Sequence, residues 1–151
     1  MVSERFNSAI EKLYKAFHYG LLNPECCNHC AVGNICDNTD SWKHLTDVHG
    51  STTLNYVGLV NENFGRRFYG YTPAELLGIE AAFLKGCGYS LPLTSKSKRP
   101  KDFRNKDSLF NGLCSAVAYL CILEGVPDIM DYSSMFDFEP ENSRGFASEM
   151  G

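Results

Sequence analysis

The sequence has no long apolar run, no glycine-rich phosphate loop and no internal repeat, and each absence narrows the function. No stretch approaches the ~20 apolar residues that a membrane-spanning helix needs. The opening MVSERFNSAIEKLYKAF alternates charged and apolar residues, whereas a secretory signal has an uninterrupted apolar core. We therefore expect a cytoplasmic protein that does not insert into a membrane. The sequence has neither a phosphate loop nor a dinucleotide-binding motif, so it gives no indication of nucleotide chemistry.

An excess of positive charge is also lacking. Fourteen basic residues stand against eighteen acidic ones, which gives a net charge of −4 and argues against nucleic acid as a partner. The 151 residues fit one domain, and 44% of them are hydrophobic. A chain of this length buries about 68–70% of the surface that its unfolded form exposes. It can therefore fold without disulfides or a metal, and the seven cysteines are expected to be reduced thiols.

Helix-capping residues and helix-ending glycines mark the limits of three long segments of the chain. Ser3 is a candidate N-cap, and apolar residues at helical spacing follow it until Gly20. The sequence Thr72-Pro73-Ala74-Glu75 is a capping box with proline at the first helical position, and glycines 86 and 88 end that helix. A last helix is expected from Asp107 or Ser108 to Gly125.

The segment between residues 20 and 65 is harder to assign. Asn23-Pro24 predicts the start of a short helix that carries the cysteines. Asp40 or Ser41 could cap the next helix, whose inward side chains would be Trp42, Leu45 and Val48. The stretch TTLNYVGLVNENFG fits a strand or a helix, and we favour a helix because its neighbours are helical. Its inward side chains would be Leu54, Val57, Val60 and Phe64.

These patterns predict an all-α fold, a compact single-domain bundle of five to seven helices over residues 1–137. Residues 128–136 could add one more turn. Residues 138–151 form an acidic tail without periodicity, which we expect to be mobile. The loop 94–107 holds six basic and two acidic side chains. Such a loop is usually solvated, and its natural partner would be an acidic protein.

Four of the seven cysteines lie in NPECCNHCAVGNIC, residues 23–36. Cys27, Cys30, His44 and His49 form the pattern C-x2-C-x13-H-x4-H, which is typical of a zinc site. Two thiolates and two imidazoles can complete a tetrahedron around Zn²⁺. Cys26, His29 and Cys36 are alternative ligands.

The same cysteines allow two other interpretations. Cys27, Cys30, Ala31 and Ile35 fall at helical spacing, and cysteine behaves as a small hydrophobe, so the segment could simply pack against a core. The third interpretation is reactive thiol chemistry, within this segment or at Cys87. A DNA-reading finger is disfavoured because Pro24 to Gly50 carries a net charge of −3.

The sequence marks no oxyanion hole and no third group that would orient a Cys–His pair. We therefore favour a non-enzymatic function over an enzymatic one. The best-supported function is an interaction or regulatory module whose Cys/His segment is structural and binds zinc or packs.

From Asn23 to Cys114 the sequence resembles a group of short bacterial proteins. The shared stretches read here NPECCNHCAVGNI, DNTDSWKHL, HGS, LNYVGLVN, GYTPAELLGIE and DSLFNGLC. Members of this group often carry the label of one component of the sodium-translocating NADH–quinone reductase. That label implies a redox or electron-transfer role with an iron–sulfur cluster, which is our alternative function.

The residues themselves do not follow the pattern of that reductase component. It resembles a plant-type ferredoxin fused to a flavin reductase, with C-x5-C-x2-C and a distant fourth cysteine. Here the order is reversed, Cys27-x2-Cys30-x5-Cys36, and no flavin motif is present. We therefore interpret the label as one passed on in error.

Overall fold

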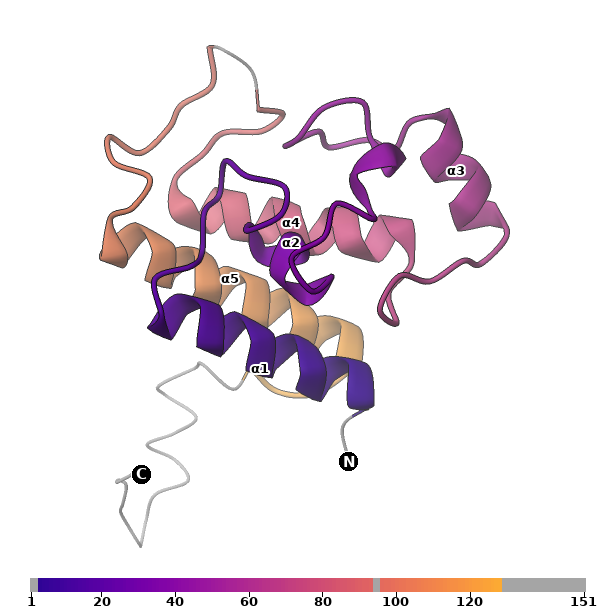
Figure 1. The fold of residues 1–151 in the computed structure, drawn as a ribbon, viewed down its shortest axis with the longest axis horizontal. Helices are drawn as coiled ribbons and strands as arrows, with labels where there is room; N and C mark the ends of the chain where they lie inside the picture. The colour runs from indigo at the N-terminus through magenta and orange to yellow at the C-terminus, as the bar shows by residue number, and fades with distance from the viewer. Residues whose placement is uncertain (1–2, 94–95, 129–151) are drawn as a thin grey trace, which may run out of the picture.

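A computed structural model describes residues 3–93 and 96–128 of the chain (Figure 1). This part forms α1 (Glu4–His18), α2 (Ala31–Ile35), α3 (Tyr56–Asn63), α4 (Pro73–Cys87) and α5 (Lys106–Glu124), with one 3-10 turn η1 (Lys43–Leu45). Within these ranges there is no strand, and one isolated β-bridge joins Phe68 to Tyr71. The all-α prediction is confirmed for the described residues. The extra turn predicted at 128–136 and the predicted tail 138–151 fall almost wholly outside them.

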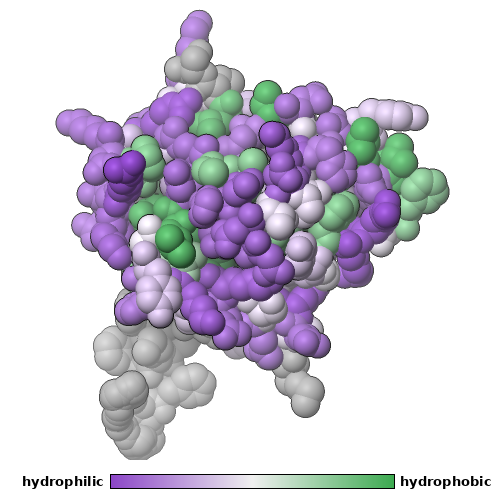
Figure 2. Space-filling model, viewed as in Figure 1, coloured by the Kyte–Doolittle hydropathy of each residue, from purple (hydrophilic) through white to green (hydrophobic). Residues whose placement is uncertain are grey.

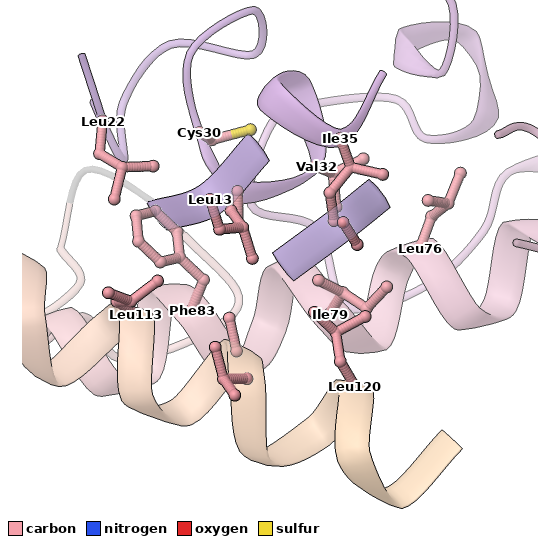
Figure 3. Close-up of a cluster of buried hydrophobic side chains, with 14 of the residues drawn as sticks. Leu13, Leu22, Cys30, Val32, Ile35, Leu76, Ile79, Phe83, Leu113 and Leu120 are labelled. Atoms are coloured by element: carbon pink, nitrogen blue, oxygen red, sulfur yellow. The ribbon is translucent and has the colours of Figure 1, made fainter. Parts of the chain in front are cut away.

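The core lies where α1, α2, α4 and α5 meet (Figure 3). Leu13 of α1, Ile35 of α2 and Leu120 of α5 are at most 2% exposed. Ile79 and Phe83 of α4 are fully buried and point into the same cluster. Burying a side chain of this size contributes about 1.5–3 kcal/mol. The amphipathic patterns of the three long helices therefore provide most of the apolar core.

The α4–α5 seam is close because small residues line it. A Cβ at Gly112 of α5 would overlap Cys87 Sγ and lie 2.9 Å from the Phe83 carbonyl oxygen. A Cβ at Gly78 of α4 would overlap the hydroxyl end of Tyr119. Gly112 lets the two helix backbones approach, whereas Gly78 leaves room for the end of the Tyr119 side chain.

The capping box predicted at the start of α4 is confirmed. The Thr72 hydroxyl accepts from the Glu75 backbone N–H at 3.3 Å, and Glu75 Oε1 accepts from the Thr72 N–H at 3.0 Å. Arg5 Nη1 lies 3.1 Å from the same Glu75 oxygen, which ties the start of α1 to the start of α4. At the other end, α4 stops at Gly88, which has φ of 107°.

Thr72→Ala should lower the free energy of unfolding by about 1 kcal/mol, because it removes the N-cap acceptor. Chemical denaturation of the variant and of the wild type would measure this difference. The exposed Thr52, which caps no helix, gives the matched control Thr52→Ala. Equal losses of unfolding free energy in the two variants would contradict the assignment of Thr72 as the N-cap of α4.

The prediction of a helix starting at Asn23-Pro24 is wrong. Residues 24–30 form turns, and α2 begins at Ala31 with Cys30 as its N-cap. The Asn23 side-chain oxygen accepts from the Glu25 N–H at 2.9 Å, and the Asn23 N–H donates to the His29 carbonyl at 2.8 Å. These local bonds compete with helix formation and close the segment into turns.

The inward faces predicted between residues 40 and 65 are partly wrong. Trp42 and Leu45 are buried, but Val48 is exposed. The segment 52–65 does contain a helix, α3, yet its buried residues are Gly58 and Asn61. A Cβ at Gly58 would overlap the Leu45 carbonyl oxygen, so this face of α3 sits directly against backbone. Of the side chains predicted to face inward, Val57 and Phe64 are exposed and Val60 is half-buried, while Leu54 packs against the core.

Candidate metal centre

Three segments far apart in the sequence converge on one buried cluster. Cys30 caps α2, His49 lies in the loop after η1, and Glu80 lies in the middle of α4. One ligand atom from each residue lies within 4.8 Å of the other two. Across residues 3–93 and 96–128, this is the one group of three such side chains at that separation.

Glu80 is 3% exposed, although it is a carboxylic acid. Its Oε1 accepts from the Val32 N–H at 3.1 Å, which ties α4 to α2. Its Oε2 lies 4.0 Å from His49 Nε2 and has no hydrogen-bond partner. Burial raises the pKa of Glu80, while the charge of His49, the hydrogen bond from the Val32 N–H and the nearby Cys30 thiol oppose that rise.

Cys30 is fully buried at the start of α2. Its sulfur accepts from the Gly33 N–H at 3.3 Å and lies 3.6 Å from the Cys27 carbonyl oxygen, to which the thiol donates. Burial raises the pKa of Cys30 well above its ordinary value, and the nearby Glu80 charge raises it further. Without a cation, this thiol is therefore protonated at neutral pH.

The His49 ring is held between a loop and the cluster. Nε2 lies 2.8 Å from the Pro24 carbonyl oxygen, and the ring packs edge-on to Trp42 with centroids 6.3 Å apart. Trp42 Nε1 in turn donates to the Cys27 carbonyl at 3.2 Å. His49 Nδ1 is buried and has no hydrogen-bond partner. Two of the three cluster residues thus carry a buried polar atom without a partner, a feature that calls for a specific explanation such as a bound ion.

The structure brings together two of the four predicted zinc ligands, Cys30 and His49. Cys27 lies beside them without joining the group, and its sulfur lies 3.2 Å from the Asn28 side-chain oxygen. His44 is exposed, with its ring 6.0 Å from that of Phe68. Glu80 takes part in the cluster and was not identified from the sequence.

The alternative ligands lie elsewhere. Cys26 Sγ is 3.5 Å from Nδ1 of the exposed His29, and this pair stands apart from the buried cluster. Burial raises the pKa of Cys36 to about 12. Cys26, Cys27, Cys30 and Cys36 all lie in the described part of the chain, where no three of their sulfur atoms form a group within 4.8 Å. This arrangement gives no support to an iron–sulfur cluster.

Cys87 does not have the environment of a nucleophile. It is 2% exposed against α5, and burial, with a further contribution from the Glu80 charge, raises its pKa to about 12. A catalytic cysteine needs a lowered pKa and access to solvent.

A small pocket of about 220 Å³ opens beside the cluster. It is lined by Glu25, Cys27, Trp42, Lys43, Thr46, Asp47, Val48 and His49. His49 is the residue that the pocket shares with the cluster, so the pocket offers an ion a path to the buried side chains.

Comparison with protein families, curated proteins and solved structures gives no match for this chain. In the described ranges, no helix combines the length and the apolar character required to cross a bilayer.

Proposed function

We propose that this protein is a helical interaction or regulatory module in which Cys30, His49 and Glu80 hold a structural Zn²⁺. The observation that carries the proposal is the convergence of three zinc-ligand types within 4.8 Å, around a buried Glu80 oxygen, Oε2, that has no hydrogen-bond partner. Thiolate, imidazole and carboxylate are the protein ligands that Zn²⁺ takes.

The spacing of the cluster suits such an ion. Two nitrogen or oxygen ligands about 2.1 Å from a tetrahedral Zn²⁺ lie ~3.4 Å apart. His49 Nε2 and Glu80 Oε2 are 4.0 Å apart, so Nε2 can bind the ion after a small movement in which it gives up its hydrogen bond to the Pro24 carbonyl oxygen.

Charge balance favours three protein ligands. One thiolate and one carboxylate together neutralise Zn²⁺, which keeps the net charge of the buried site at zero. A second thiolate from Cys27 would leave a negative charge in the interior. The fourth position is then taken by water, an arrangement more usual in catalytic than in structural zinc sites.

The ion would fix a part of the chain that has little regular structure. Between the end of α2 at Ile35 and the start of α3 at Tyr56, η1 is the one helical turn. Loops of this length inside a domain are uncommon unless they have a function or a tether. Zinc at His49 would fasten this loop to α2 and α4.

The fastened loop in turn carries α3. The Asn55 N–H donates to the Leu45 carbonyl at 2.9 Å, and the Asn55 side-chain amide donates to the His44 carbonyl at 2.9 Å. Asn55 is also the N-cap of α3, because its side chain accepts from the Gly58 N–H at 2.8 Å. The position of α3 therefore depends on the loop that contains His49.

The surface offers features that suit interaction. Tyr56 and Phe64, at the two ends of α3, are 81% and 80% exposed. Figure 2 shows apolar surface on the side of the molecule where α3 lies. Exposed apolar groups in such a cluster commonly mark a contact site. The basic loop is the second feature, since its cations from Lys96 to Lys106 are exposed and would suit an acidic protein.

The pair Cys30→Ser and Cys27→Ser tests the ligand set. Cys30→Ser should abolish stoichiometric zinc binding, because it removes one of three ligands. Cys27→Ser should retain it, since Cys27 lies outside the cluster. Elemental analysis of both variants and of the wild type, each purified without a histidine tag, would measure zinc per chain.

Equal zinc loss in the two variants would restore the ligand set predicted from the C-x2-C pattern. Full zinc retention in Cys30→Ser would contradict the proposed site.

A further inference from the structure

An apolar groove of about 470 Å³ runs along the seam between α1 and α5. It is lined by Tyr14, Lys15, Phe17, His18, Tyr19, Phe110 and Leu113. Tyr14 is 40% exposed and Tyr19 69% exposed, so two aromatic rings of this lining face solvent. A lining of this composition fits aromatic and aliphatic side chains.

Positive charge borders the groove. Lys15 and His18 belong to its lining and are exposed. Lys106, the first residue of α5, holds its ammonium group 4.7 Å from the centre of the Phe17 ring. The lining itself holds no acidic residue, while Glu11 lies 3.7 Å from Lys15 and Asp107 follows Lys106 in α5. The groove therefore suits a segment that combines apolar and acidic side chains.

The last described residue, Asp128, lies beside the seam that holds this groove. α5 stops at Gly125, which has φ of 78°, and in Figure 1 the chain from Val126 to Asp128 turns back toward α1. Burial raises the pKa values of Tyr14 and Cys114, and the Asp128 carboxylate is among the neighbours that raise both further. Asp128 thus lies beside the α1–α5 seam, next to a residue that lines the groove.

Twenty-three residues, 129–151, follow Asp128. They include five acidic and one basic residue, a net charge of −4, and four aromatic residues. The stretch that directly follows Asp128 in the sequence is IMDYSSMFDFE, residues 129–139, in which apolar and acidic side chains alternate irregularly.

We propose that residues 129–139 of the same chain dock in the α1–α5 groove, with aromatic side chains against Phe17 and Phe110 and acidic side chains toward Lys15, His18 and Lys106. The reach is sufficient. Along α5, the eight residues from Cys114 to Lys106 span about 12 Å. An extended chain covers that distance in about four residues. This inference is independent of the zinc site, because none of its residues belongs to that cluster.

Nuclear magnetic resonance on the full chain tests the proposal. Docking predicts cross-relaxation between the rings of Phe136 or Phe138 and the side chains of Phe17, Phe110 or Leu113. It also predicts backbone heteronuclear relaxation values for residues 131–138 close to those of α1. Absence of these contacts, or contacts of the same rings with α3, would overturn the proposal.

A mixture of labelled and unlabelled chains separates two sources of the contacts. Signals confined within one molecule support docking of the chain's own segment, whereas signals between molecules would overturn it in favour of exchange between copies. The double variant Lys15→Glu with Lys106→Glu should lose the contacts, and the exposed Lys43→Glu in η1 is the matched control. Persistence of the contacts in the double variant would overturn the role given to charge.

Discussion

Glu80→Gln is expected to change thermal stability in opposite directions with and without zinc. With zinc present, the variant loses a ligand and should melt lower than the wild type. A ligand at one hundred times its dissociation constant stabilises the native state by about 2.7 kcal/mol. For a domain of this size, that corresponds to a melting temperature on the order of 5–10 °C lower in the variant.

In metal-free protein the sign should reverse. Burial raises the pKa of Glu80 above its ordinary value of 4.5, so the acid contributes most to stability below pH 4.5 and loses that contribution as the pH rises through the raised pKa. Glutamine is neutral and keeps an oxygen for the Val32 N–H. The variant should therefore melt above the wild type at pH 8 after chelation, and the difference should shrink toward pH 4.

Thermal melts of both proteins, with zinc and with a chelator, would measure these shifts. The exposed Glu11 supplies a matched control, since Glu11→Gln removes one carboxylate outside the cluster. If Glu80→Gln melted higher than the wild type even with zinc present, Glu80 would be a buried acid and not a ligand.

Gly112→Ala should lower the free energy of unfolding by about 2 kcal/mol, within the range for an overpacked core. The new methyl group would overlap Cys87 Sγ and lie 2.9 Å from the Phe83 carbonyl oxygen, and backbone cannot move aside as a side chain can. α4 and α5 must then separate along a seam that both helices bury.

Gly78→Ala is the matched control for that variant. Its methyl group would meet the end of the Tyr119 side chain, which can swing away. Alanine is also a better helix former than glycine by about 0.5–1 kcal/mol. Gly78→Ala should therefore be neutral or slightly stabilising in the same denaturation experiment. Similar losses for both glycines would mean that the seam is not rigid at Gly112.

The ends of the long helices could be predicted because their signals are local. Ser3, the Thr72–Glu75 capping box and Gly125 act on backbone groups within a few residues. The region between α1 and α4 was less predictable, because its structure depends on a competing turn and on a contact between distant residues. There the Asn23 side chain forms a turn where Pro24 suggested a helix, and a tertiary contact with the Leu45 carbonyl turns α3 onto Gly58.

The candidate metal cluster was predictable in part, since two of its three residues follow from the sequence pattern. Cys30 and His49 follow from the spacing of cysteines and histidines, because such spacing reflects local loop closure. His44 fits the same pattern but turns toward Phe68, a tertiary contact that the spacing cannot report. Glu80 comes from another part of the chain. One sequence signal for it exists, since positions 76, 79, 80 and 83 share a helix face and a glutamate among those apolar residues is unusual.

Zinc content is the most direct measurement of the central claim. Untagged protein would be equilibrated with a slight excess of Zn²⁺, freed of unbound metal by gel filtration, and analysed for metal and protein together. We expect one zinc per chain in the wild type and in Cys27→Ser, and none in Glu80→Gln or Cys30→Ser. A wild-type chain that keeps no zinc after this treatment would rule out the zinc site at Cys30, His49 and Glu80.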